Sequence, residues 1–190
     1  MEVAENVYVE VPLLDATPES LEEYGILIGE TVCQPGLAIP FYQGSVEEGQ
    51  NLDFRYAGQA VVRTARISRR SPEVTWLERH LRMTQIFVGL GGSPFAMVLG
   101  KPNHQKGEEI PRLEDVRAFR LPAGHGLMIH AGTWHDFPMA LEEPVTVLTM
   151  NSAEVVEALA HAASADEMDT GDVFKIDVRR RTGKTLRVPF

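Results

Sequence analysis

The fold of this chain is decided by the stretch from Gln59 to Met150, which opens with QAVVRTARIS and closes with PVTVLTM. Short runs rich in Val, Ile, Phe and Thr recur along it, and Gly and Pro separate them. The runs are AVVRTARIS (60–68), RMTQIFVGL (82–90), FAMVLG (95–100), VRAFRL (116–121), GLMIH (126–130) and PVTVLTM (144–150). Short β-branched and aromatic runs between turn residues are typical of an antiparallel barrel or sandwich. The sequence therefore predicts an all-β fold with a few short flanking helices.

The segment before this stretch predicts a strand, a short helix and a long loop. Residues 3–11 alternate apolar and polar side chains, as a strand does. Thr17-Pro18 predicts an N-cap followed by proline in the first helical turn, with Leu21 and Tyr24 on the buried face. Residues 33–58 are rich in Pro, Gly and polar residues and predict a long loop, a type of segment that often acts as a functional lid.

The segment after it predicts a helix and a hairpin. From Ser152, a candidate cap, the apolar residues follow a helical period, and the acidic residues 164–172 predict a linker. The end, DVFKIDVRRRTGKTLRVPF, predicts a hairpin that turns at 182–184. We expect one domain over residues 1–190, with a barrel core at about 59–150, an N-terminal arm at 1–58, and the helix and hairpin at 152–190.

The charge and cysteine content exclude several classes of protein. The chain has 18 basic and 27 acidic residues, a net charge of −9, which argues against nucleic acid or an anionic membrane as a partner. It holds a single cysteine, Cys33, so no intramolecular disulfide can form. No apolar run reaches the roughly 18 residues of a membrane helix, and the N-terminus lacks the features of a signal peptide. We expect a cytoplasmic protein.

The first segment that can carry chemistry runs from Glu78 to Gly92. If residues 76–84 form a strand, alternation places Trp76, Glu78, His80, Arg82 and Thr84 on one face. A carboxylate, an imidazole and a guanidinium that share a buried space need each other, a metal or a ligand, because an unpaired buried charge costs several kcal/mol or more. Gln85 has the opposite parity and joins this face only if a bulge or bend intervenes.

The second segment is His130-Ala-Gly132-Thr-Trp134-His135. Gly132 permits a tight turn, and His130 and His135 converge only through that bend. One histidine alone is more often structural than a ligand, and Trp134 alone more often packs than binds. Because two segments agree, we favour a shared polar site for Glu78, His80 and His135, of the kind that suits a borderline metal or a small anionic substrate.

The first segment resembles the first cupin motif, which reads His-x-His, three or four residues, Glu, six residues, Gly. Glu78 stands at the first histidine, His80 matches the second, and Gln85 replaces the glutamate. Gly92 falls at the required distance.

The second segment resembles the second cupin motif, Pro-x-Gly-x-x-His, with His130 in place of the proline. The resemblance implies a single cupin domain, a jelly-roll-like antiparallel β-barrel, and one divalent metal with no organic cofactor. The four ligand positions it implies are Glu78, His80, Gln85 and His135.

Within the cupins, the chain resembles the ureidoglycolate lyase family over roughly residues 10–150. The matching elements are Glu78-Arg79-His80, Thr84-Gln85, Phe87, Arg117-Ala118-Phe119, Gly124 to Gly126, His130 and Trp134-His135, with Glu23-Tyr24-Gly25 and the Phe41 to Val46 stretch before them. The chain departs from the family at four polar positions. Ile129 replaces a tyrosine, Asp136 a histidine, and Asn151 and Ser152 an aspartate and a glycine.

This resemblance implies cleavage of the C–N bond of a ureidoglycolate-like carbinolamine to glyoxylate and urea, a step of purine and allantoin catabolism. His135 or His80 would act as base, and Glu78 would orient a histidine or, with a pKa raised by burial, act as acid. Arg82 would bind the substrate carboxylate. Gln85, His130 and Trp134 would also contact substrate, and a metal at the four ligand positions would instead polarise it.

Two other functions remain open on sequence grounds. One is a different metal-dependent cupin enzyme that acts on an α-hydroxy or keto acid. The other is a non-catalytic cupin that binds a small acid or a sugar. For the lyase the expected partner is a small anionic substrate, and the resemblance implies a homodimer.

Overall fold

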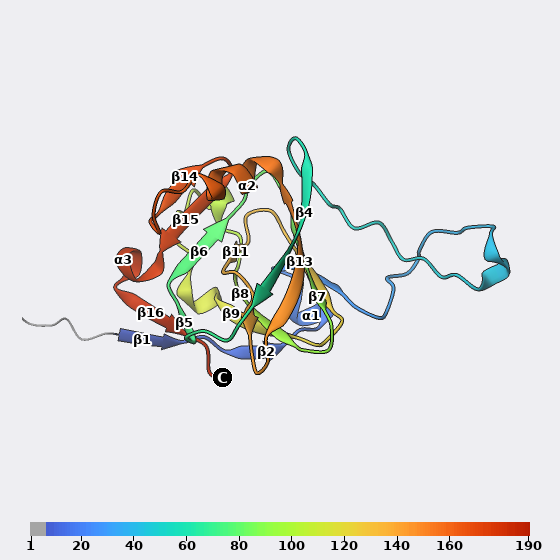
Figure 1. Cartoon of the computed structure of the whole chain (residues 1–190), viewed down its shortest axis with the longest axis horizontal. Helices are drawn as coiled ribbons and strands as arrows, with labels where there is room; N and C mark the ends of the chain where they lie inside the picture. The colour runs from blue at the N-terminus through green and yellow to red at the C-terminus, as the bar shows by residue number, and fades with distance from the viewer. Residues whose placement is uncertain (1–6) are drawn as a thin grey trace, which may run out of the picture.

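The structure, a computed structural model, describes residues 7–190 as a layered β fold (Figure 1). A five-stranded sheet faces an eight-stranded sheet, and a three-stranded sheet packs against the outer side of the eight-stranded one. The strand predicted at 3–11 is present as β1 (Val7–Glu10), and the part of that prediction before residue 7 lies outside the described residues. No helix in the described part of the chain is long and apolar enough to cross a membrane.

The five-stranded sheet is antiparallel throughout. Its strands, in spatial order, are β3 (Gly25–Ile28), β10 (Gly126–Ile129), β7 (Gln85–Leu90), β13 (Val145–Ser152) and β4 (Ala60–Ile67).

The eight-stranded sheet has one parallel pair, β2 with β9. Its strands, in spatial order, are β14 (Met168–Thr170), β15 (Val173–Asp177), β6 (Trp76–Arg79), β11 (Trp134–His135), β8 (Phe95–Gly100), β9 (Arg117–Leu121) and β2 (Leu13–Asp15), with β12 (Met139–Ala140) beside β8.

The small sheet and the helices complete the fold. The small sheet contains β1, β16 (Lys184–Arg187) and β5 (Glu73–Val74), and the helices are α1 (Pro18–Leu21), α2 (Ala153–Ala160) and α3 (Val178–Thr182).

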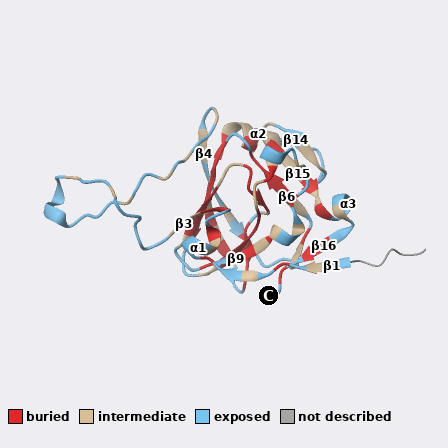
Figure 2. Cartoon of the chain, turned by 180° about the vertical axis from the view of Figure 1, so that it is seen from behind, coloured by how far each residue is buried: buried red, intermediate tan, exposed pale blue. Residues whose placement is uncertain are grey.

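Two apolar clusters lie on opposite sides of the eight-stranded sheet, whose central strands, such as β8, are buried on both faces (Figure 2). Between the larger sheets, Phe87, Phe119 and Val147 are fully buried. On the outer side, Leu77 and Trp134 pack with residues of the small sheet. Because side chains alternate along a strand, the same β6 that sends Leu77 outward sends Glu78 inward, into the space between the sheets.

The main sequence-based predictions of the fold are confirmed. The chain is mainly β and arranged as a jelly-roll-like sandwich, although the hydrogen-bonded sheets do not close on each other. The Thr17 hydroxyl caps α1, and Leu21 and Tyr24 are buried. The Ser152 hydroxyl caps α2 by accepting from the Val155 N–H.

Three predictions are wrong in detail. The strand predicted over 76–84 ends at Arg79, because the chain bends before β7 begins at Gln85. The predicted C-terminal hairpin does not form, because α3 separates β15 from β16, and β16 pairs with β1 and β5 instead. The predicted linker 164–172 contains β14.

The loop from Lys101 to Arg112 contains a buried anchor. Asn103 accepts hydrogen bonds from Trp134 Nε1 at 2.8 Å and Arg79 Nη1 at 3.1 Å. Its own Nδ2 donates to Glu108 Oε2 and to the Ile110 carbonyl. The Arg79 guanidinium lies 4.4 Å from the Trp134 ring centroid, so this loop is fastened to the outer face of β6 and β11.

We predict that Asn103→Ala lowers the free energy of unfolding by about 2–4 kcal/mol, because the buried Trp134 N–H loses its acceptor. Urea denaturation measures this change. Gln105→Ala, an exposed change on the same loop, is the control and should stay within about 0.5 kcal/mol of the parent. Equal stabilities of the two variants would contradict the anchoring role.

Candidate functional site

Three charged or titratable side chains form a row across the inner face of the eight-stranded sheet. The strand register places Glu78 of β6 directly opposite Lys175 of β15 on one side and His135 of β11 on the other. Lys175 Nζ donates to Glu78 Oε2 at 2.8 Å, and His135 Nε2 lies 3.5 Å from Glu78 Oε1. Glu78 is therefore a buried carboxylate with a different partner for each oxygen.

His80 joins this row from the bend that follows β6. Its ring centroid lies 5.1 Å from that of His135. The bend is held by the turn between β14 and β15, where the Asp172 carboxylate accepts hydrogen bonds from the Leu81 and Arg82 N–H groups. The Asp172 carbonyl lies 2.6 Å from His80 Nδ1. One residue of the C-terminal region thus fixes both the bend and the imidazole.

Both imidazoles are oriented by backbone carbonyls. His80 Nδ1 donates to the Asp172 carbonyl, and His135 Nδ1 donates to the Thr133 carbonyl at 3.1 Å. A carbonyl accepts only, so each ring carries its proton on Nδ1 and leaves the lone pair on Nε2. Both Nε2 atoms are buried without a hydrogen-bond partner in the described residues.

The local charges favour ionised Glu78 and neutral His80. Burial opposes ionisation of Glu78, but the neighbouring His135 and the ammonium group of Lys175 outweigh it and hold the pKa of the carboxyl well below its usual range. Burial, together with the neighbouring His135, lowers the pKa of His80. The option that burial raises the pKa of Glu78 and makes it an acid is therefore wrong.

These groups fit a divalent metal ion. One ligand atom each from Glu78, His80 and His135 lies within 4.8 Å of the others, and all three residues are buried. Two imidazole lone pairs and a carboxylate are donors that suit Zn²⁺, Fe²⁺ or Ni²⁺. The carbonyls on each Nδ1 are the outer hydrogen bonds that metal-binding histidines usually make.

A pocket of about 360 Å³, lined by both polar and apolar side chains, opens beside Glu78. The inner face of β13 is apolar at Val145 and Val147 and polar at Thr149 and Asn151, and the polar half lines the pocket. The other lining residues are Arg63, Thr64, Ala65, Glu78, Gln85, Phe137, Val156, Leu159 and Ala160. Glu78 is the member of the triad that lines this pocket, and the two histidines are more deeply buried.

Gln85 reaches the pocket because of the bend that sequence parity required. The chain turns between Arg79 and Gln85, so Gln85 starts a new strand with its side chain inward. Its Nε2 donates to Asn151 Oδ1 at 2.5 Å, while its Oε1 has no partner among the described residues. The two amides form a paired polar wall.

Three residues predicted to contact substrate lie outside the pocket lining. Arg82 is on the bend, half-exposed, with its guanidinium paired to Glu154 and near Asp172. His130 Nε2 donates to the Glu22 carbonyl. Trp134 faces the opposite side of β11 from His135 and packs against Arg79.

The structure also brings in residues that sequence reasoning missed. Arg63 is the only cationic side chain among the pocket-lining residues, and Thr149 and Asn151 come from β13. Lys175 and Asp172 hold the triad from behind. An arginine on an edge strand carries no local signal of this role, because its approach to Glu78 depends on which strands are neighbours.

The departures from the family pattern fall mostly outside the pocket. Ile129 belongs to the apolar core, Asp136 pairs with Arg70 at 2.5 Å, and Ser152 caps α2. Asn151 is the departure that lines the pocket, where its amide pairs with Gln85.

Comparisons with known proteins give a family match over most of the chain. The sequence model of a family described as ureidoglycolate lyase matches residues 12–170. The chain is 37% identical over 68 residues to the ureidoglycolate lyase of Azotobacter vinelandii (strain DJ). This alignment covers 36% of this chain and 38% of that protein. The aligned part is thus well under half of the relative. Among solved structures, a dTDP sugar isomerase from Desulfovibrio desulfuricans G20 has 16% identity and a TM-score of 0.37, over 66% of this chain and 74% of that one.

The metal-free protein should lose stability in two steps as pH falls. The folded-state pKa of His80 is lowered, so the unfolded chain takes up this proton first, and stability falls from about pH 6.5 downward. The folded-state pKa of Glu78 is also lowered, so its contribution is present above about pH 4.5 and is lost below it.

Thermal unfolding in EDTA between pH 7.5 and 2.5 follows both steps. His80→Gln should flatten the upper step and leave the lower one, whereas His161→Gln, at an exposed position, should change neither. An upper step of the same size in the parent and in His80→Gln would show that His80 does not carry it.

Proposed function

This chain belongs to the ureidoglycolate lyase family, and from this we propose that it cleaves a ureidoglycolate-like carbinolamine to glyoxylate and urea. The observation that carries the proposal is the convergence of Glu78, His80 and His135 beside a pocket that holds one arginine. The reaction breaks the C–N bond, forms a carbonyl from the hydroxyl, and moves one proton from that oxygen to the departing nitrogen. It involves no oxidation or reduction.

We propose that Glu78, His80 and His135 hold a divalent ion, with Gln85 as a further oxygen donor at the same pocket. Such an ion, when bound, polarises the hydroxyl and carboxylate oxygens of the substrate. The burial of the imidazoles supports this role over direct proton acceptance, because the pocket lining includes Glu78 but neither histidine. Lys175 keeps Glu78 ionised and fixes the oxygen that faces away from His135.

The pocket supplies separate contacts for the two ends of the substrate. Arg63 is the candidate partner for the carboxylate, because a guanidinium binds a carboxylate through two parallel hydrogen bonds. The Gln85–Asn151 amide pair offers complementary donors and acceptors to the ureido group. Arg82 is a weaker candidate, because its guanidinium is already paired with Glu154.

Several further predictions accompany this proposal. We expect a small anionic substrate, a role in purine or allantoin nitrogen catabolism, a homodimer and a cytoplasmic location. Membership of the ureidoglycolate lyase family supports the first two. The roles of His130 and Trp134 in substrate binding have little support, since both side chains are engaged elsewhere.

Release of glyoxylate and urea from ureidoglycolate tests the function. The purified protein should show turnover that is lost in EDTA and restored by Zn²⁺, Mn²⁺ or Ni²⁺, and Glu78→Gln and His135→Ala should each reduce it at least about 100-fold. Turnover that survives complete removal of metal would assign proton acceptance to the imidazoles instead. No turnover by folded, metal-loaded protein would contradict the lyase assignment.

We predict that Arg63→Leu raises the KM for ureidoglycolate by about 10–100-fold with a smaller effect on kcat, because a charged hydrogen bond contributes about 1.5–3 kcal/mol. Arg82→Leu is the matched control and should change KM less than about threefold, since Arg82 lies outside the pocket lining. Steady-state kinetics of both variants measures this. The reverse ranking would return the carboxylate contact to Arg82.

A further inference from the structure

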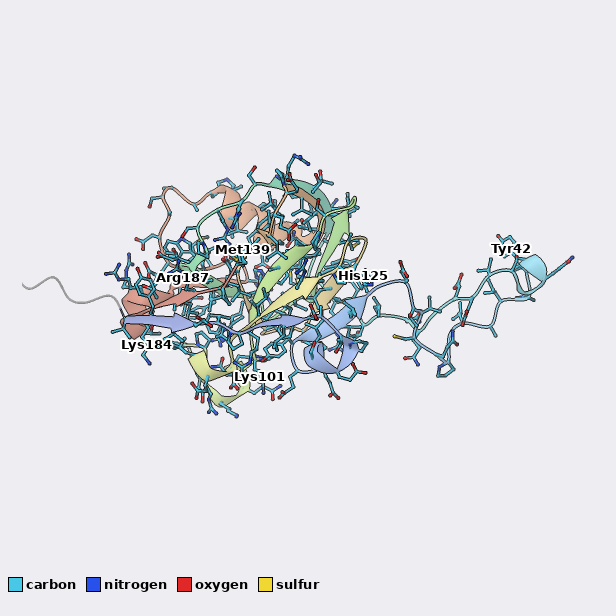
Figure 3. The ribbon with its side chains drawn as sticks, turned by 90° about the horizontal axis from the view of Figure 1, so that it is seen from below. Tyr42, Lys101, His125, Met139, Lys184 and Arg187 are labelled. Atoms are coloured by element: carbon cyan, nitrogen blue, oxygen red, sulfur yellow. The ribbon has the colours of Figure 1, made fainter. Side chains whose placement is uncertain are left out.

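A long protruding loop, residues 29–59, leaves the body of the molecule between β3 and β4. Figure 1 shows it projecting from the side of the molecule on which β4, β13 and β7 lie, and Figure 3 shows Tyr42 at its far end. Loops of this length without regular structure are uncommon in compact domains unless they have a function. The loop is the largest feature of the fold that the proposed lyase site does not use.

The stem of this loop is held together by its own hydrogen bonds. Gln34 Nε2 donates to Glu47 Oε1, Gln50 Nε2 donates to the Gln34 carbonyl, and the Gln50 N–H donates to the Cys33 carbonyl. The two sides of the loop are therefore joined near its middle. Beyond this join, the side chains of Phe41 and Tyr42 are each 67% exposed, and their ring centroids lie 6.3 Å apart.

The loop presents much more apolar surface than a solvated loop needs. Its exposed large apolar side chains are Val32, Leu37, Phe41, Tyr42, Val46 and Tyr56. Exposed apolar groups that cluster on one element mark contact surfaces in soluble proteins. The aromatic tip is of the residue type that is enriched in protein interfaces.

The outer face of the five-stranded sheet is a second apolar surface on the same side of the molecule. The register places Val62 beside Met150, and Leu148 beside Val88, all with side chains directed away from the core. Val62 is 57% exposed and Leu90 43% exposed, and Val88, Leu148 and Met150 are half-buried. A sheet face of this composition is usually covered.

The charges on the two surfaces are complementary. The loop has four acidic residues, Glu30, Glu47, Glu48 and Asp53, and one basic residue, Arg55, which pairs with Asp53, so three acidic side chains remain. On and just after β4, Arg66 and Arg69 are exposed, and neither has an ion-pair partner among residues 7–190. Opposite charges at facing surfaces fix the register of an association and accelerate it.

We propose that the protruding loop of one copy of this chain lies across the outer face of the five-stranded sheet of a second copy. In a two-fold dimer the contact occurs twice, loop on sheet and sheet on loop, so both apolar surfaces are covered without any other protein. The loop is long enough to cross the sheet. The chain from Gly29 to Tyr42 reaches at most roughly 50 Å, and five strands span roughly 20 Å. This inference does not depend on the proposed lyase activity.

Sedimentation velocity of the full-length chain at 1–50 µM tests the dimer. The parent should be a dimer, and Phe41→Ser/Tyr42→Ser should raise its dissociation constant at least about 30-fold, as expected when interface aromatics are removed. Leu14→Ser, an exposed apolar change on β2 of the other large sheet, is the control and should remain dimeric. Circular dichroism should show that each variant is folded.

Charge reversal identifies the two surfaces. The variant Glu47→Arg/Glu48→Arg has a basic loop that faces a basic sheet surface in a dimer with itself. The variant Arg66→Glu/Arg69→Glu has an acidic sheet surface that faces an acidic loop. Because like charges then meet, each variant alone should be monomeric. Mixed in equal amounts, they should form a one-to-one heterodimer, because both loop–sheet contacts then join opposite charges. A dye on Cys33, the single cysteine and exposed on the loop, reports the mixing by fluorescence.

Three results would overturn the proposal. The first is a monomeric parent at 50 µM, which would mean that the loop serves its own chain or a different protein. The second is a dimer that survives both the aromatic and the charge variants. The third is a pair of folded charge variants that do not associate when mixed.

Discussion

A carboxylate that is removed from water needs a compensating charge, and Glu78 obtains one from Lys175 on a neighbouring strand. Lys175 on β15 and His135 on β11 stand directly opposite Glu78 in the strand register. Keeping this charge ionised between the sheets requires that β6 be an interior strand with a partner on each side. The site therefore depends on sheet register more than on any single side chain.

The C-terminal segment is part of the site. The family match ends at residue 170, and the two residues that hold the triad from behind, Asp172 and Lys175, come just after it. The Asp172 carbonyl sets the tautomer of His80, and the Asp172 carboxylate holds the bend that brings His80 beside His135.

The sequence was sufficient to predict the convergence of Glu78, His80 and His135, because strand alternation and motif spacing are local properties. It also predicted that Gln85 needs a bend, and the bend is present. The prediction that Arg82 shares this face was wrong, because it extended strand alternation past Arg79, where β6 ends.

Arg63 and Lys175 could not be predicted, because their contacts depend on which distant strands are adjacent. Helix α3 was predictable in principle. Asp177 accepts from the Arg180 N–H as an N-cap, and Gly183 ends the helix in the left-handed conformation.

X-ray absorption spectroscopy of the cobalt-loaded protein examines the triad itself. The spectrum should show two imidazole nitrogens and at least one carboxylate oxygen at about 2.0–2.2 Å from one stoichiometric ion, by analogy with zinc. A stoichiometric ion surrounded by oxygen alone, without imidazole scattering, would mean that His80 and His135 do not form a metal site with Glu78.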